Sequence, residues 1–110
     1  MFVQMRTIKT PEGNAKHVAE RFSGEGIVEK QPGFVDRLVM AKKVRRGEEE
    51  VVVMIRWQSE DDWKRWEKSE AHIAGHKANL GKPKPDYIIS SDGALYDVEA
   101  VIQAAEQASK

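Results

Sequence analysis

The fold is decided by residues 34–57, which read FVDRLVMAKKVRRGEEEVVVMIRW. Two largely apolar stretches, 34–44 and 49–57, flank the polar turn Arg45-Arg46-Gly47-Glu48, and this pattern predicts a β-hairpin. The second strand contains five consecutive apolar residues, Val51 to Ile55, so both of its faces are expected to be covered. Because one set of helices in a chain of 110 residues covers one face, we expect a second subunit on the other.

The segment before the hairpin predicts a strand and a helix. Residues 2–8 mix apolar and polar side chains at period two, which indicates a strand. Apolar residues recur at helical spacing over 15–23, and Asn14 is placed to cap that helix. Residues 27–30 are expected to resume helix after two glycines, before a turn at 31–33.

The segment after the hairpin is predicted to form helix and then strand, the second half of the fold. Ser59 is expected to cap a second helix whose first turn is acidic, and a further helical stretch covers 71–79. Two prolines make 81–85 a loop, and 87–96 is predicted to be the fourth strand.

This order is β-α-β-β-α-β, that of an α+β ferredoxin-like plait with antiparallel strands and helices on one face. We expect one domain over residues 1–97 and a tail over 98–110. Val98, Val101, Ile102 and Ala105 lie at helical spacing, so the tail is predicted to form a short amphipathic helix.

Composition excludes several classes of function. The 18 Lys and Arg balance the 18 Asp and Glu, which argues against a general nucleic-acid binder. The lack of cysteine excludes disulfides, thiolate metal sites and cysteine nucleophiles. No apolar run approaches the roughly 20 residues of a membrane span, and the start lacks a signal peptide, so a cytoplasmic protein is expected.

His72 and His76 lie four apart, on one face of the predicted helix. Such a pair can bind a divalent metal, as in zinc metalloproteases. However, no glutamate follows His72 directly and no third ligand is evident, so surface histidines are the favoured interpretation.

The same region is rich in aromatic and small residues. Trp57, Trp63 and Trp66 fall within ten residues, and they predict either core packing or the wall of a pocket for a flat apolar ligand. Gly75 and the alanines beside His76 leave a bare helical surface, with room for a large planar group and an imidazole that can bind its iron. Tight packing of this helix on the sheet explains the small residues equally well, and the residues alone favour it.

The stretch WEKSEAHIAGHKAN, residues 66–79, resembles the helix of Isd-type haem-degrading monooxygenases of the antibiotic-biosynthesis-monooxygenase superfamily. The resemblance covers residues 2–97 and is closest to the bacillus-type members. Its most specific element is the pair Trp66 and His76; further matches are Pro11-x-Gly13, Arg21-Phe22, Pro32-Gly33-Phe34 and Val52–Trp57 followed by Ser59.

The resemblance implies roles for individual residues. His76 matches the histidine that ligates the haem iron, Trp66 the tryptophan that presses on the porphyrin, and Phe22 a position that borders the haem pocket. It also implies a homodimer whose sheets pack face to face into an α/β barrel, each subunit holding its own haem. The apolar strand at 51–55 agrees with such a dimer.

Arg6 departs from the family pattern. It stands at the position of the family's asparagine, a hydrogen-bond donor on the distal side of the haem. Arginine is also a donor, but it is longer and permanently charged. It can serve as the distal donor, pair with a haem propionate, or turn to solvent, and the sequence leaves these roles open.

The reaction implied is oxidative opening of haem with release of iron, driven by dioxygen and an external electron donor or reductase. Haem is then both substrate and cofactor, and Arg21, Lys77 and Lys82 are candidates to meet its propionates. Two alternatives stay open: a non-catalytic haem buffer or sensor, and a cofactor-free monooxygenase of an aromatic small molecule.

Overall fold

The computed structural model describes residues 1–78, 80–81 and 85–105. Its elements, in chain order, are β1 (Phe2–Thr10), α1 (Ala15–Arg21), the 3-10 helix η1 (Val28–Lys30), β2 (Phe34–Ala41), β3 (Glu49–Trp57), α2 (Glu60–Glu67), α3 (Glu70–Ala78) and β4 (Ser90–Asp97). The predicted β-α-β-β-α-β order is confirmed, with the second helical region divided into α2 and α3.

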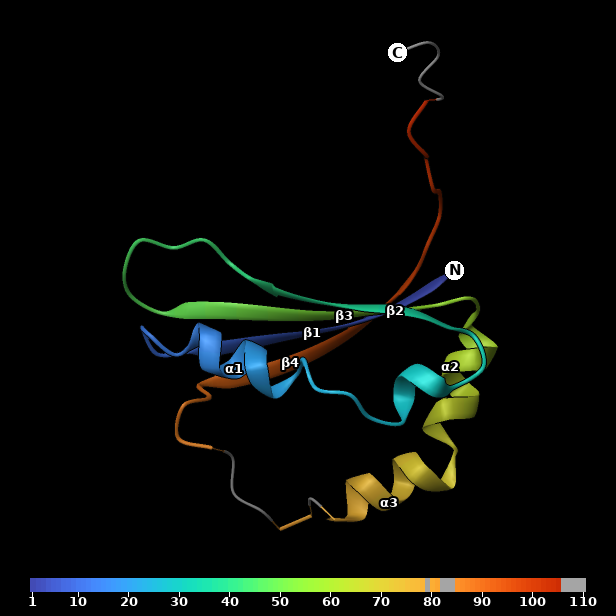
Figure 1. Cartoon of the computed structure of the whole chain (residues 1–110), viewed down its shortest axis with the longest axis horizontal. Coiled ribbons are helices and arrows are strands. Elements are labelled where there is room, and N and C mark those ends of the chain that lie inside the picture. Colours follow the sequence, from blue (N-terminus) through green and yellow to red (C-terminus); the bar gives the residue numbers. More distant parts are fainter. Residues whose placement is uncertain (79, 82–84, 106–110) are drawn as a thin grey trace.

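The four strands form one antiparallel sheet in the order β2-β3-β1-β4. The helices lie on one face of this sheet (Figure 1). The sheet of the single chain is open and forms no closed barrel, because β2 and β4 are edge strands.

The core lies between α1 and the two central strands. Ile8 of β1 and Val51 and Val53 of β3 point to the helical face, where they pack with the fully buried Val18 of α1. Burying each such side chain contributes roughly 1.5–3 kcal/mol. The register pairs Ile8 with Val51, so alternation along both strands fixes which residues reach this face.

The centre of the opposite face of the sheet is apolar and is uncovered in the described part of the chain. Val52 and Met54 are half-buried there beside Leu38 and Met40, which are 36% and 38% exposed. Tyr96, on the same face of β4, is 51% exposed. The helices of the chain thus cover one face of β3 as predicted, and no described residue packs on the other face, where the expected second subunit stays a prediction.

The two predicted helix caps have different outcomes. Ser59 caps α2 as predicted, because its Oγ accepts a hydrogen bond from the Asp62 amide at 3.2 Å. Asn14 occupies the cap position of α1, but its side chain does not bond to the helix. Glu49 of β3 does so instead, accepting from the Ala15 amide at 2.8 Å. A carboxylate distant in sequence thus ties the start of α1 to the sheet.

The C-terminal tail differs from the prediction. Residues 98–105 carry no helix and leave the sheet on the side opposite the helices (Figure 1). Val101 and Ile102 are 61% and 88% exposed, so the apolar stripe has no surface to pack on. Short helices are marginal in water without such packing. Residues 106–110 of the predicted helix lie outside the described residues.

No helix in the described part of the chain is long and apolar enough to cross a membrane.

Candidate active site

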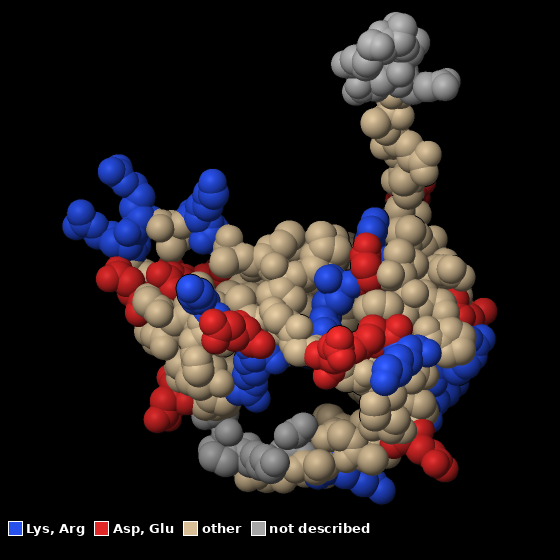
Figure 2. Space-filling model, viewed as in Figure 1, with Lys and Arg blue, Asp and Glu red and all other residues tan. Residues whose placement is uncertain are grey.

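A cavity of about 700 Å³ lies against the helical face of the sheet. It is lined by residues of β1, β3 and β4, by Arg37 of β2, and by the end of α1: Gln4, Met5, Arg6, Arg21, Phe22, Gly24, Arg37, Val53, Ile55, Gly93, Ala94 and Leu95. Figure 2 shows the molecule hollowed below the sheet, with basic and acidic side chains beside the opening. The volume of the cavity falls in the range of small-molecule sites, roughly 300–1,000 Å³.

Arg6 reaches this cavity from the middle of the sheet. It lies opposite Val53 of β3 and Gly93 of β4, and its exposed side chain points to the helical face. Its Nη1 donates a hydrogen bond to Ser91 Oγ at 2.9 Å. A Cβ at Gly93 would lie 3.9 Å from Arg6 Nη2, so the guanidinium passes close over the Gly93 backbone.

Two more guanidinium groups line the same cavity. Arg21, at the end of α1, donates from Nη1 to the Tyr87 hydroxyl at 2.9 Å. Arg37 of β2 donates from Nη2 to the Gly24 carbonyl at 2.6 Å, and its Nη1 lies 4.0 Å from Glu29 Oε1. The cavity is therefore rich in cations, and an anionic substrate suits it.

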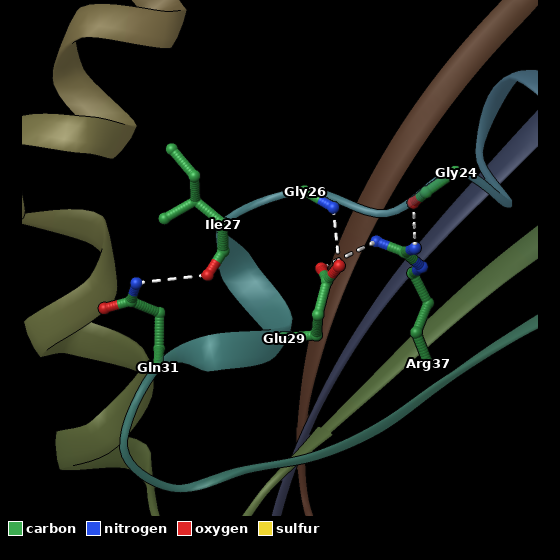
Figure 3. Close-up of polar contacts among 6 residues, drawn as sticks. All are labelled: Gly24, Gly26, Ile27, Glu29, Gln31 and Arg37. Atoms are coloured by element: carbon green, nitrogen blue, oxygen red, sulfur yellow. Dashed lines mark hydrogen bonds and ion pairs between the residues drawn. The ribbon is translucent and has the colours of Figure 1, made fainter.

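Glu29 and Arg37 hold the segment between α1 and β2 against the sheet (Figure 3). The Glu29 carboxylate accepts a hydrogen bond from the Gly26 amide. This bond, a second from the Glu29 amide and the Arg37 cation hold the pKa of the Glu29 carboxyl below its usual value. Gln31 Nε2 donates to the Ile27 carbonyl at 3.1 Å, which closes the turn around η1.

Gln4 and Arg37 line the cavity although sequence reasoning missed them. Gln4 Oε1 is buried and has no hydrogen-bond partner among the described residues. The signal that could have identified Gln4 is its spacing, because it shares a strand face with Arg6 two residues later. Arg37 could be placed only once β2 is paired with β3.

The cavity brings together two of the four predicted site residues. Arg6 and Phe22 line it, whereas Trp66 and His76 are not among its described lining residues. Trp66, on α2, is half-buried and packs edge-on against His72, with ring centroids 5.1 Å apart. His76, on α3, is exposed.

The other two tryptophans belong to the interior. Trp57 is fully buried and meets the Phe34 ring edge-on, with centroids 5.7 Å apart. Trp63 packs against Phe2 at 5.2 Å. Core packing is therefore confirmed for Trp57, and Trp63 contacts the first strand.

The His72–His76 pair does not form a metal site in the described residues, where no group of three possible ligands occurs. His72 Nε2 instead lies 3.1 Å from Glu67 Oε2.

The bare surface of α3 is not explained by tight packing on the sheet. Among the described residues outside its own helix, a Cβ at Gly75 would meet no atom within 4 Å, and Ala74 and Ala78 are exposed. The interpretation that the residues alone favoured is wrong, because the surface beside His76 is not packed on the sheet in the described part of the chain. Lys77 is exposed on the same helix, while Lys82 and part of the loop at 80–86 lie outside the described residues.

Comparison with known proteins gives concordant matches. The family described as antibiotic biosynthesis monooxygenase matches residues 1–78. The haem-degrading monooxygenase HmoA of Bacillus subtilis is 66% identical over 103 residues, which cover 94% of this chain and 95% of HmoA. A Bacillus cereus crystal structure assigned to the antibiotic biosynthesis monooxygenases has 54% identity and a TM-score of 0.83, covering 96% of this chain and 98% of that chain.

A more distant structure shares the fold alone. It is the haem degrader MhuD from Mycobacterium tuberculosis with two haems bound in its active site. MhuD is 18% identical with a TM-score of 0.64, over 94% of this chain and all of that chain.

Proposed function

This chain belongs to the antibiotic biosynthesis monooxygenase family, and we infer that it is a haem-degrading monooxygenase. The observation that carries the inference is its 66% identity, over 94% of its length, to the haem-degrading monooxygenase HmoA. The substrate is therefore haem, and the reaction opens its macrocycle and releases iron.

The cavity fits haem as a substrate. Its apolar lining includes Phe22, Ile55 and Leu95, which suit the face and edge of a porphyrin. Its guanidinium groups suit the two propionate carboxylates, since arginine forms paired hydrogen bonds with carboxylates. A volume of about 700 Å³ leaves room for a large planar ligand.

Bound haem supplies the redox-active iron, and dioxygen with an external electron donor supplies the oxidant and the electrons. We assign His76 as the iron ligand, because its imidazole is exposed on the bare surface of α3. The neutral imidazole is the ligating form. Ile73 lies one turn away and is 43% exposed, so a macrocycle that extends from the cavity to α3 buries this side chain as well.

Trp66 and Phe22 shape the bound substrate in this proposal. The Trp66 indole, held against His72, presents a rigid surface that presses on the macrocycle and bends it. Phe22 borders the cavity from the end of α1. Holding the macrocycle in one geometry accelerates the reaction by positioning, without a further chemical group.

We propose that the protein is a homodimer whose subunits meet through the open sheet face. The exposed Leu38 and Met40, beside Val52 and Met54 of β3, and the exposed Tyr96 on the same face of β4 support this. A contiguous apolar face of this kind is typical of an interface. Such a dimer forms the closed barrel that the single chain lacks.

We further propose that the enzyme works in the cytoplasm with a cellular reductase.

The experiment adds haemin to the purified protein in air and follows the Soret band, then adds ascorbate with catalase present. Catalase removes free peroxide, so decay of the band reports enzymatic turnover. We expect a stoichiometric complex that decays with release of iron. His76→Ala should lose the complex, while Lys16→Ala, which alters an exposed side chain on α1, should keep it.

A complex that persists after reductant is added would identify a haem carrier or sensor. Failure to bind haem would contradict the proposal and direct the search to aromatic small molecules.

A further inference from the structure

We propose that Arg6 and Arg21 form a pair of carboxylate-binding residues that fixes which way round the haem lies, with both propionates on the β4 side of the cavity. This inference rests on the proposed function. It assigns Arg6 to the substrate's carboxylates, one of the three roles that the sequence leaves open.

Both guanidinium groups are directed to the same short segment, residues 87–91, which leads into β4. Arg6 donates to Ser91 Oγ and Arg21 to the Tyr87 hydroxyl, each at 2.9 Å. Ser91 and Tyr87 are four residues apart, and both arginines line the one cavity. Two cations thus lie on a single side of the site.

Neither cation is neutralised in the described part of the chain. Arg6 and Arg21 each donate to a hydroxyl group, which is neutral, and no ion pair between described residues involves either of them. A carboxylate that replaces a hydroxyl converts a neutral-acceptor bond into a charge-assisted one, which is roughly twice as strong. Both side chains are exposed, so a ligand can reach them.

The opposite side of the cavity is electrically balanced. Arg37 belongs to β2, the other edge strand, and Glu29 lies 4.0 Å from it while Gly24 accepts its hydrogen bond. Arg6 belongs to β1, which lies two strand spacings from β2, about 10 Å. The cationic excess is therefore confined to the β4 side.

This asymmetry suits the chemistry of haem. The two propionates leave one edge of the macrocycle, and the opposite edge is apolar. Turning the haem round would take both carboxylates from the two unpaired cations to one cation that Glu29 already neutralises. The orientation in turn sets which meso carbon is presented for opening, since small displacements of a reacting centre change its rate strongly.

The experiment compares haem with its dimethyl ester, which keeps the macrocycle and iron but lacks the carboxylates. Dissociation constants come from quenching of tryptophan fluorescence and from the Soret band, for the full-length wild type and for Arg6→Gln, Arg6→Lys, Arg21→Gln and Arg37→Gln. Arg65→Gln is the control for loss of one positive charge, because Arg65 lies on α2 and pairs with Asp62.

We expect the wild type to bind the diacid more tightly than the ester. Arg6→Gln and Arg21→Gln should each reduce that preference about tenfold or more. Arg6→Lys should restore part of it, and Arg65→Gln should keep it. With turnover, Arg6→Gln should also give a mixture of ring-opened isomers where the wild type gives one.

Retention of the preference in Arg6→Gln, with its loss in Arg37→Gln, would overturn the assignment. Wild-type protein that binds haem and never opens it would refute the proposed function, while the ratio of diacid to ester affinities still decides the role of Arg6. Failure to bind haem would refute both.

Discussion

Arg6 and Gly93 face each other across β1 and β4, and the Arg6 guanidinium lies over the Gly93 backbone to reach Ser91 Oγ at 2.9 Å. The absence of a side chain at Gly93 leaves this path open. A strand glycine at such a position marks a close approach by another group. The position of a cation in the proposed site thus depends on the residue opposite it in the sheet.

Gly93→Leu should therefore displace Arg6 and lower haem affinity about tenfold, the effect expected from one lost charge-assisted hydrogen bond. Gly93→Ala is the matched control. Its Cβ would make ordinary contacts, at 3.8 Å from the Met5 carbonyl and 3.9 Å from Arg6 Nη2, and it should bind haem as the wild type does. Equal affinities in both variants would show that Arg6 does not depend on Gly93.

Trp66→Leu should reduce turnover more than binding. The apolar leucine still contacts the macrocycle but cannot press on it as a rigid indole does, so we expect at least a tenfold fall in the rate of Soret decay, on the order expected for a misplaced substrate. The dissociation constant for haem, measured on the same sample, should change less. A variant with wild-type turnover would remove Trp66 from the mechanism.

Gln4→Leu should stabilise the free protein by about 1 kcal/mol. Gln4 Oε1 is buried without a partner among the described residues, and such a group carries a desolvation penalty of roughly 1–3 kcal/mol. Urea unfolding measures the difference. Gln58→Leu, at an exposed position, is the control and should stay within about 0.5 kcal/mol of the wild type. Destabilisation by Gln4→Leu would indicate that the amide has a partner in solution.

Glu49→Gln should destabilise the protein at neutral pH, with a difference that shrinks as the pH falls. Hydrogen bonds from the backbone of Ala15, Gly13 and Asn14 hold the pKa of the Glu49 carboxyl below its usual value. Because this pKa is lower in the folded protein than the unperturbed glutamate value of about 4.3, the ionised carboxylate stabilises the fold above that pH. The stabilisation is lost as the pH falls through the pKa of the folded state.

Denaturant unfolding of Glu49→Gln and the wild type at pH 7 and pH 3 measures this convergence. Glu48→Gln, its exposed neighbour, is the control. A constant difference at both pH values would mean that the Glu49 charge does not hold α1.

Met54→Arg should turn a dimer into a monomer. Met54 lies at the centre of the open sheet face, between Leu38 on one side and Met5 on the other. Two copies packed through this face would bury the new charge beside its own symmetry mate, which is costly. Sedimentation equilibrium should give twice the chain mass for the wild type and the chain mass for the variant. A monomeric wild type would contradict the proposed dimer.

The order of the elements could be predicted because it depends on local patterns. The apolar period of two over 2–8 and the period of helices over 15–23 act between residues close in the chain, and so does the Ser59 cap. The prediction of a helix in the tail was wrong because it too used only local spacing. Its spacing is helical, but a helix there needs a surface that the single chain does not offer.

The candidate site was only partly accessible to the same reasoning. Trp66 and His76 were identified by resemblance, and Arg6 by its departure from the family pattern. Gln4 and Arg37 were not found, because their place on the cavity follows from strand pairing and not from any motif.

The sequence by itself determined the plait and the side-chain chemistry available to it, since periodicity and capping are encoded within a few neighbouring residues. Only the tertiary structure decided which charges are balanced. Glu49 holds α1 across 34 residues, Glu29 lies beside Arg37, and Arg6 meets a hydroxyl 85 residues away. Such partners are set by strand register and by the packing of helices on the sheet, and these depend on the whole chain at once.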